Sequence, residues 1–328
     1  MKAEDGVRKP AIVIIAIATM TIVSIGKAWS QSLTVAVTPV GSVTIPMTDD
    51  NRASFVDVDL PTAKDVVNDM HVLIIANGKY KTEKDIATAA NDGKSIKNYC
   101  TRTLGIPEKH VDFRSDLSKT EMEFELDAFI RLIELFPNDR FMFFYIGHGM
   151  PGESDSYLVP VDGRSTVNEV QLKKICVSRG ELMGRFAAAH PRQLVVYLES
   201  CFSGANSGTT AGNMDDAARD MMKYSEGTSG LRLSDEAELG FGGNIILLSA
   251  CSSRETACAL PSEGHNAFTF EFLKALKRTA GDITWGQLFS DVQIATQQVA
   301  KVERKLDQTP SITVSSSLDD SWKNWSVK

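Results

Sequence analysis

Short, uninterrupted apolar runs constrain the fold of this 328-residue chain more than any other feature. The longest such runs, rich in branched and aromatic side chains, are residues 71–76, 141–146, 195–198 and 245–250. A strand with one exposed face alternates apolar and polar residues, so runs without alternation predict strands that are buried on both faces.

Helical spacing of apolar residues separates these runs. The expected helices cover residues 87–104, 119–136, 178–189, 265–276 and 285–302. Strands that alternate with helices predict an α/β fold, here a three-layer sandwich with a mostly parallel sheet between two layers of helices.

Two of the expected strands end in reactive side chains. One runs into Glu199, Ser200 and Cys201, and another runs into His148 between two glycines. The carboxyl ends of parallel strands are where open α/β sheets place their chemistry. A cysteine needs a basic neighbour, because the thiolate is the nucleophile and is a minority species at neutral pH. Single cysteines and histidines are usually structural, but two at strand ends, each followed closely by glycine, predict a nucleophile and its base.

These two motifs resemble those of the caspase-like cysteine peptidases. They read Tyr145-Ile146-Gly147-His148-Gly149 and Leu198-Glu199-Ser200-Cys201-Phe202-Ser203-Gly204. Cys201 follows His148 by 53 residues (201 − 148), close to the roughly 50 that separate the two in caspases. The resemblance runs from about Met70 to Pro310 and is closer to the metacaspase and paracaspase branch than to true caspases. Ser200-Cys201-Phe202 departs from the signature of true caspases, so their substrate rule is not carried over.

The resemblance implies a caspase-like fold and cysteine endopeptidase activity. Cys201 would attack the peptide carbonyl, and His148 would act as general base and as proton donor to the leaving amine. Backbone N–H groups of Cys201 and Gly149 would hold the oxyanion.

Three acids extend the resemblance to the substrate. Glu199 lies two residues before the nucleophile, Asp92 matches the acidic position after the first strand, and Glu255 matches an acid after the last core strand. Carboxylates in a partly buried site pair with guanidinium or ammonium groups. The expected substrates are proteins or peptides with Arg or Lys at P1. Glu199 replaces the family's usual Asp, which leaves the balance between Arg and Lys open.

Residues 205–240 follow the nucleophile and are rich in Gly, Ser, Thr, Asp and Met. The composition predicts a long exposed loop, and such loops are preferred sites of proteolytic nicking. The loop carries Arg219, Lys223 and Arg232, which a basic P1 site would accept. The family often processes itself here, so we expect self-cleavage after one or more of the three; ordinary solvated charges are the alternative.

No metal or cofactor is expected. Asp215, Asp216 and Asp220 lie together in the same loop without the ligand spacing of an EF-hand, so a solvated acidic segment is favoured over a calcium site. The five cysteines include no Cys-x-x-Cys pair. A disulfide between Cys251 and Cys258 is left open.

The amino terminus is typical of an exported protein. The apolar run 11–25 is followed by Ala28-Trp29-Ser30, with small residues at both positions of a cleavage site before Gln31, and is preceded by Lys2, Arg8 and Lys9. The run is shorter than the about 20 residues of a membrane span. Residues 1–30 therefore predict a signal peptide, with an uncleaved membrane anchor as the alternative. Either would place the body of the protein outside the cytoplasm, as a periplasmic, secreted or membrane-anchored protein.

The remaining chain is expected to comprise a linker (31–69), one peptidase domain (70–310) and a tail (311–328). The net charge of −7 argues against a nucleic-acid partner. Two other functions stay open: a catalytically inactive caspase-like scaffold, and a different cysteine acyl-transferase or hydrolase. The His148/Cys201 pair argues against the scaffold, and the three acids would have no role in the acyl-transferase.

Overall fold

A computed structural model describes two units of the chain, Met1–Arg52 and Ala53–Lys328. In the first unit it describes only the strands β1 (Ser32–Ala36) and β2 (Ser42–Pro46), which pair as an antiparallel hairpin. In the second unit it describes all residues except 153–154, 165–167, 201–240 and 253–254. The expected signal peptide or anchor at residues 1–30 lies outside this part. None of the described helices is long and apolar enough to cross a membrane.

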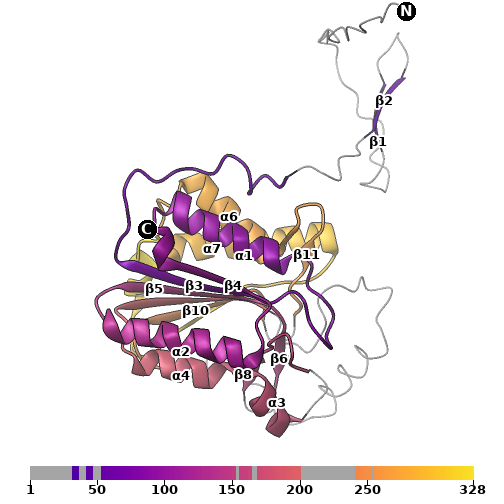
Figure 1. Cartoon of the computed structure of the whole chain (residues 1–328). Helices are drawn as coiled ribbons and strands as arrows, with labels where there is room; N and C mark the ends of the chain where they lie inside the picture. Colours follow the sequence, from indigo (N-terminus) through magenta and orange to yellow (C-terminus); the bar gives the residue numbers. More distant parts are fainter. Residues whose placement is uncertain are drawn as a thin grey trace, which may run out of the picture. The chain divides into compact units, whose positions relative to one another are not determined.

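A six-stranded sheet forms the centre of the larger unit (Figure 1). Its strands are β3 (Met70–Ala76), β4 (Val111–Ser115), β5 (Arg140–Ile146), β9 (Gln193–Glu199), β10 (Ile245–Ser249) and β13 (Ser311–Val314). The order across the sheet is β13-β10-β9-β5-β3-β4, and every pair is parallel except β10 with β13. Strands β3, β9 and β10 are buried along their whole length, which confirms the interpretation of the apolar runs.

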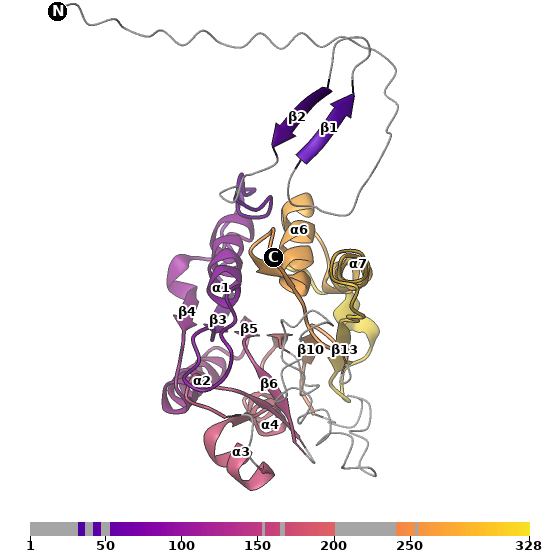
Figure 2. The ribbon, with the colours of Figure 1, turned by 90° about the vertical axis from the view of Figure 1, so that its right-hand side faces the viewer.

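Helices cover both faces of this sheet (Figures 1 and 2). One layer contains α1 (Ala89–Asn98), α6 (Ala267–Thr279) and α7 (Trp285–Val299), and the other contains α2 (Lys119–Leu135) and α4 (Arg179–Ala188). Successive side chains of a strand point to opposite faces. Accordingly, Val72 and Ile74 of β3 join the core under the first layer, whereas Leu73 and Ile75 join the core under the second. The expected three-layer α/β sandwich is confirmed.

The helix ends follow local signals. Ser178 precedes α4, and its hydroxyl accepts a hydrogen bond from the Glu181 N–H at 3.0 Å, which is one of the two bonds of a capping box. The helix expected from His265 begins two residues later, because His265 and Asn266 form the short strand β12, which pairs with β11 (Ala259–Leu260). This difference matters for the site described below.

A small sheet of three strands follows β5. It consists of β6 (Gly149–Pro151), β7 (Ser156–Leu158) and β8 (Val177–Ser178), accompanied by α3 (Glu169–Ile175). Tyr157 and Leu172 belong to its own apolar cluster. The backbone that leaves His148 is therefore held in a sheet.

The domain is longer at both ends than the sequence analysis expected. Residues 311–328 are not a tail: β13 lies at the edge of the main sheet, and Trp322 is buried in the short helix η5 (Asp320–Asn324). Val56 and Leu60, expected in a linker, are buried in the core under α1 and α6. These segments were missed because short elements that bury single side chains carry little periodicity.

Candidate active site

The carboxyl ends of β5 and β9 form one edge of the sheet. Ile146 pairs with Glu199 in parallel register, and the Gly147 N–H donates to the Glu199 carbonyl at 3.2 Å. A small cavity at this edge is lined by Ile86, Gly147, His148, Glu199, Ser200, Ala257 and Asn266. The structure thus brings together His148 and Glu199, which the sequence assigned to the base and to the P1 site. Cys201 is the next residue after Ser200 and lies outside the described part of the chain.

His148 is half-buried and held from two sides. Its backbone N–H donates to the Tyr80 hydroxyl at 2.8 Å, and its Nε2 lies 2.7 Å from the Lys84 carbonyl oxygen. A carbonyl can only accept, so Nε2 carries the proton and Nδ1 is left as the acceptor. Burial lowers the pKa of His148, although the Lys84 carbonyl opposes this effect. The imidazole is therefore neutral near pH 7, as a general base must be.

The group that orients His148 was not foreseen from the sequence. It is a main-chain carbonyl in the segment between β3 and α1, and any residue type supplies such a carbonyl. No side-chain pattern could have identified it. Gly149, assigned to the oxyanion site, is buried at the start of β6 opposite Leu158.

Glu199 is 3% exposed and is anchored by the first turn of α6. One of its carboxylate oxygens accepts from the Thr269 N–H at 2.8 Å and from the Thr269 hydroxyl at 2.7 Å. A helix amino terminus presents unpaired N–H groups and a partial positive charge, which favour an ionised carboxylate. These bonds fix the Glu199 carboxylate beside the cavity and favour its ionised form.

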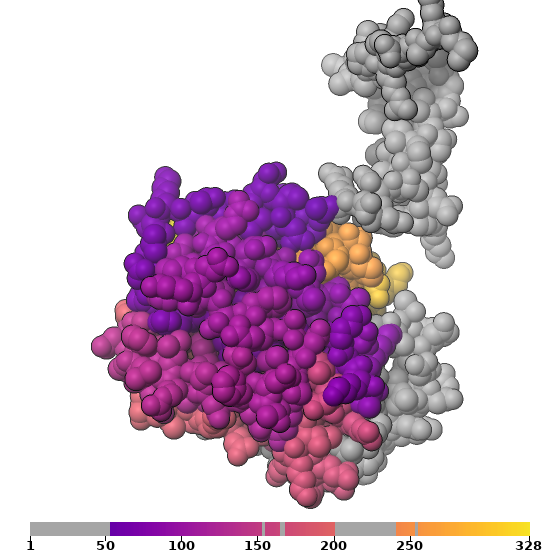
Figure 3. All heavy atoms as spheres, in the orientation of Figure 1, coloured from indigo at the N-terminus to yellow at the C-terminus, as the bar shows by residue number. Residues whose placement is uncertain are grey.

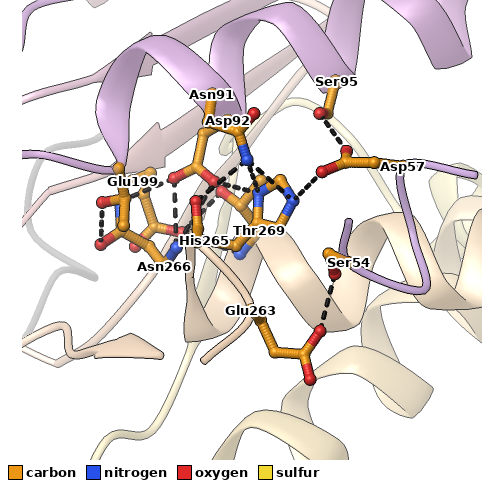
Figure 4. Close-up of polar contacts among 12 residues, drawn as sticks. Ser54, Asp57, Asn91, Asp92, Ser95, Glu199, Glu263, His265, Asn266 and Thr269 are labelled. Atoms are coloured by element: carbon orange, nitrogen blue, oxygen red, sulfur yellow. Dashed lines mark hydrogen bonds and ion pairs between the residues drawn. The ribbon is translucent and has the colours of Figure 1, made fainter. Parts of the chain in front are cut away.

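Asp92 takes a different position from the one expected of a cavity wall (Figure 4). It is fully buried in the first turn of α1, and Oδ1 lies 2.7 Å from Nδ1 of His265. Its Oδ2 accepts from the Asn266 amide at 2.7 Å. Asn266 lines the cavity and Asp92 does not. Asp92 thus acts on the cavity through Asn266.

His265 is a central residue that the sequence analysis did not single out. It is 0% exposed, and its two ring nitrogens contact two carboxylates, Asp92 and, at 3.1 Å, Asp57. Burial opposes the charged imidazole, but the hydrogen bonds and charges of both carboxylates outweigh burial and raise the pKa of His265 to about 9. Burial raises the pKa of Asp92 to about 6, against the opposing bonds from His265 and Asn266. Near pH 7 a buried imidazolium therefore lies between two carboxylates.

Glu255, the third acid assigned to the P1 site, is not among the residues that line the cavity. Its carboxylate accepts from the Thr309 N–H at 2.6 Å and from the Thr309 hydroxyl at 2.9 Å. It ties the loop after β10 to the segment before β13. Cys251 and Cys258, whose pairing the sequence left open, are both thiols.

Several predicted residues fall within 201–240, outside the described part of the chain. They are the nucleophile Cys201, the self-cleavage candidates Arg219, Lys223 and Arg232, and the acids Asp215, Asp216 and Asp220. Among the residues that the structure describes, no three His, Cys, Asp or Glu side chains gather as metal ligands.

Replacing His265 by Asn should change how stability depends on pH. A pKa raised from 6.5 to about 9 gives stability that is fully present below pH 6.5 and is lost as pH rises to 9. Relative to the variant, the wild type should lose on the order of 2–3 kcal/mol of unfolding free energy over this range. Urea denaturation at several pH values measures the difference. His190→Asn, at an exposed histidine, is the control, and equal slopes in wild type and His265→Asn would contradict the network.

Comparisons with known proteins agree with this architecture. The family model described as "Caspase domain" matches residues 69–321. The crystal structure of protein GSU0716 from Geobacter sulfurreducens superposes with a TM-score of 0.50 and 17% identity, over 77% of this chain and 96% of that chain. At this identity the likeness concerns the fold. No curated protein matches the chain. Because the family model spans most of the described domain, from β3 to η5, the chain belongs to the caspase-domain family, which comprises cysteine-type peptidases.

Proposed function

We propose that this protein is a cysteine endopeptidase that cleaves after Arg or Lys, with Cys201 as nucleophile and His148 as base. The observation that supports it most is the meeting of a neutral, oriented imidazole and a buried carboxylate, Glu199, on one cavity. Ser200 lines the same cavity and directly precedes Cys201.

The proposed reaction uses groups at the ends of β5 and β9. Nδ1 of His148 accepts the thiol proton of Cys201, and the thiolate attacks the carbonyl carbon of the scissile bond. Backbone N–H groups of Cys201 and Gly149 stabilise the oxyanion. His148 then returns its proton to the leaving amine, and water hydrolyses the acyl-enzyme. The Lys84 carbonyl keeps Nε2 protonated throughout, so that Nδ1 remains the catalytic nitrogen.

The P1 preference follows from the charges around the cavity. Glu199 carries one negative charge, and Asp57, His265 and Asp92 together carry one more near pH 7. Glu199 and Asp92 are shielded from water, and a buried carboxylate favours a cationic partner. Glu255 is left out of the proposed P1 site because its carboxylate binds Thr309.

Cys201→Ala and His148→Ala should each lower peptide cleavage by at least about a thousandfold, because each removes a group that forms or breaks a bond. Fluorogenic peptides with Arg or Lys at P1 measure the loss, with circular dichroism as the check on folding. Cys100→Ala and His190→Asn are controls at residues away from the cavity. Undiminished cleavage by folded Cys201→Ala protein would refute the nucleophile.

Glu199→Gln should lower kcat/KM for Arg and Lys peptides by one to three orders of magnitude, since losing a desolvated charge pair costs roughly 2–5 kcal/mol. Glu255→Gln is the matched control and should leave the P1 preference unchanged. A peptide panel varied only at P1 measures both variants. Efficient wild-type cleavage after Asp would overturn the basic P1 site.

Self-cleavage should occur after one or more of Arg219, Lys223 and Arg232. The basis is the composition of residues 205–240 and the fit of these side chains to the proposed P1 site. Intact-mass measurement over time on concentrated protein detects the cuts. Cys201→Ala should stay whole, as should a variant with all three residues replaced by Gln. A wild type that cleaves peptides and yet stays whole would exclude self-processing.

A further inference from the structure

The segment 53–60 lies before the residues that match the family model, and it is fastened to the helix layer beside the cavity. We name it the strap. Tyr99 donates its hydroxyl to the Val56 carbonyl at 2.8 Å, and Ser54 donates to Glu263 at 2.7 Å. Lys277 of α6 donates to the Phe55 carbonyl at 2.7 Å and lies 4.0 Å from the centre of the Phe55 ring. In Figure 3 indigo atoms from the start of this unit lie beside orange atoms from its later part.

One strap residue reaches the buried charges behind the cavity. The Asp57 carboxylate contacts His265 Nε2 at 3.1 Å and accepts a hydrogen bond from the Ser95 hydroxyl of α1 (Figure 4). Burial opposes its ionisation, but the bonds from His265 and Ser95 outweigh burial and hold the pKa of Asp57 below its usual value. Asp57 is therefore an anion fixed between the strap, α1 and β12.

A chain of short contacts leads from Asp57 to the cavity. His265 contacts Asp57 with one ring nitrogen and Asp92 with the other. Asp92 in turn accepts a hydrogen bond from the side-chain amide of Asn266 at 2.7 Å. The amide oxygen of Asn266 accepts from the Thr88 hydroxyl at 3.0 Å, so both ends of the amide are fixed. Asn266 then lines the cavity together with His148 and Glu199.

The charges explain why the contacts that lead to the cavity depend on Asp57. Removing one partner from a buried ion pair leaves the other as an uncompensated charge, which is strongly unfavourable. With Asp57 present, His265 stays protonated and donates to Asp92 from one nitrogen and to Asp57 from the other. In the described part of the chain, the titratable groups that form ion pairs with His265 are these two carboxylates, which also make the largest contributions to its raised pKa apart from burial. Without Asp57, His265 would lose its second hydrogen-bond acceptor and one of the two negative charges that stabilise its protonated form.

We propose that Asp57 of the strap is a positioning residue for the basic P1 site, acting through His265 and Asp92 on Asn266. The inference deepens the proposed function and rests on it. The peptidase unit accordingly begins at about residue 53, before the first core strand, and the strap completes the P1 wall from behind.

The test compares Asp57→Asn with Asp59→Asn in the full chain. Both variants make the same change two residues apart; Asp59 is exposed and has a φ of 46°, a left-handed conformation that Asn tolerates. Asp57→Asn should lower kcat/KM for Arg peptides by about tenfold, mainly through a higher KM, because the reacting groups are untouched. The alkaline limb of the kcat/KM–pH profile of Asp57→Asn should also move to lower pH, since His265 loses its proton more readily in this variant. Asp59→Asn should match the wild type in both respects, and Asp57→Glu should recover part of the loss.

Two further measurements keep the outcomes distinct. If Asp57→Asn does not fold, Ser95→Ala, which removes another bond to the Asp57 carboxylate, takes its place. NMR titration of the His265 ring reports the contact without any activity, and its pKa should fall in Asp57→Asn and not in Asp59→Asn. Unchanged KM, pH profile and titration in Asp57→Asn would overturn the inference. A wild type that cleaves no Arg or Lys peptide would instead overturn the proposed function, while the titration still decides whether Asp57 holds His265 charged.

Discussion

The parallel pairing of β5 with β9 is the contact on which the site depends. It aligns Ile146 with Glu199, so the residues that follow both strands emerge at one edge. Because both strands are buried on both faces, a slip in register would expose large side chains such as Phe143 and Tyr197, each 0% exposed, to the wrong packing partners. The same apolar packing that stabilises the sheet therefore fixes the spacing between His148 and the end of β9.

Behind this edge, electrostatics replaces apolar packing. Asp92 and His265 are both 0% exposed. Removing their charges from water is unfavourable, and it is tolerated only because each charge has a close partner of opposite sign. Asp57 is the second anion that contacts His265, and Asn266 links Asp92 to the cavity that it lines. The carboxylate of Glu199 is held separately, by the amino terminus of α6. Two independent anchors thus shape the proposed P1 site, and one of them reaches the strap.

Much of this architecture could be predicted from the sequence, because long apolar runs and capped helices are local signals. Residues 141–146 predicted β5 to within one residue, and Ser178 predicted the start of α4. The site was harder to predict from the sequence. His265 contacts Asp57 across 208 positions in the chain, and a pair so far apart leaves no local pattern. Asn266, directly before α6, is a residue type favoured at helix starts, a signal that was available and would have corrected the helix boundary.

The most direct test of this account uses a peptidyl reagent with Arg at P1 and a thiol-reactive group in place of the scissile bond. Such a reagent forms a covalent bond only if the P1 side chain is bound and the nucleophile is activated. Mass spectrometry of the digested protein then locates the adduct. We expect a single adduct on Cys201, formed far faster than with the matched reagent that carries Asp at P1. An adduct on another cysteine, or equal rates for Arg and Asp reagents, would contradict it.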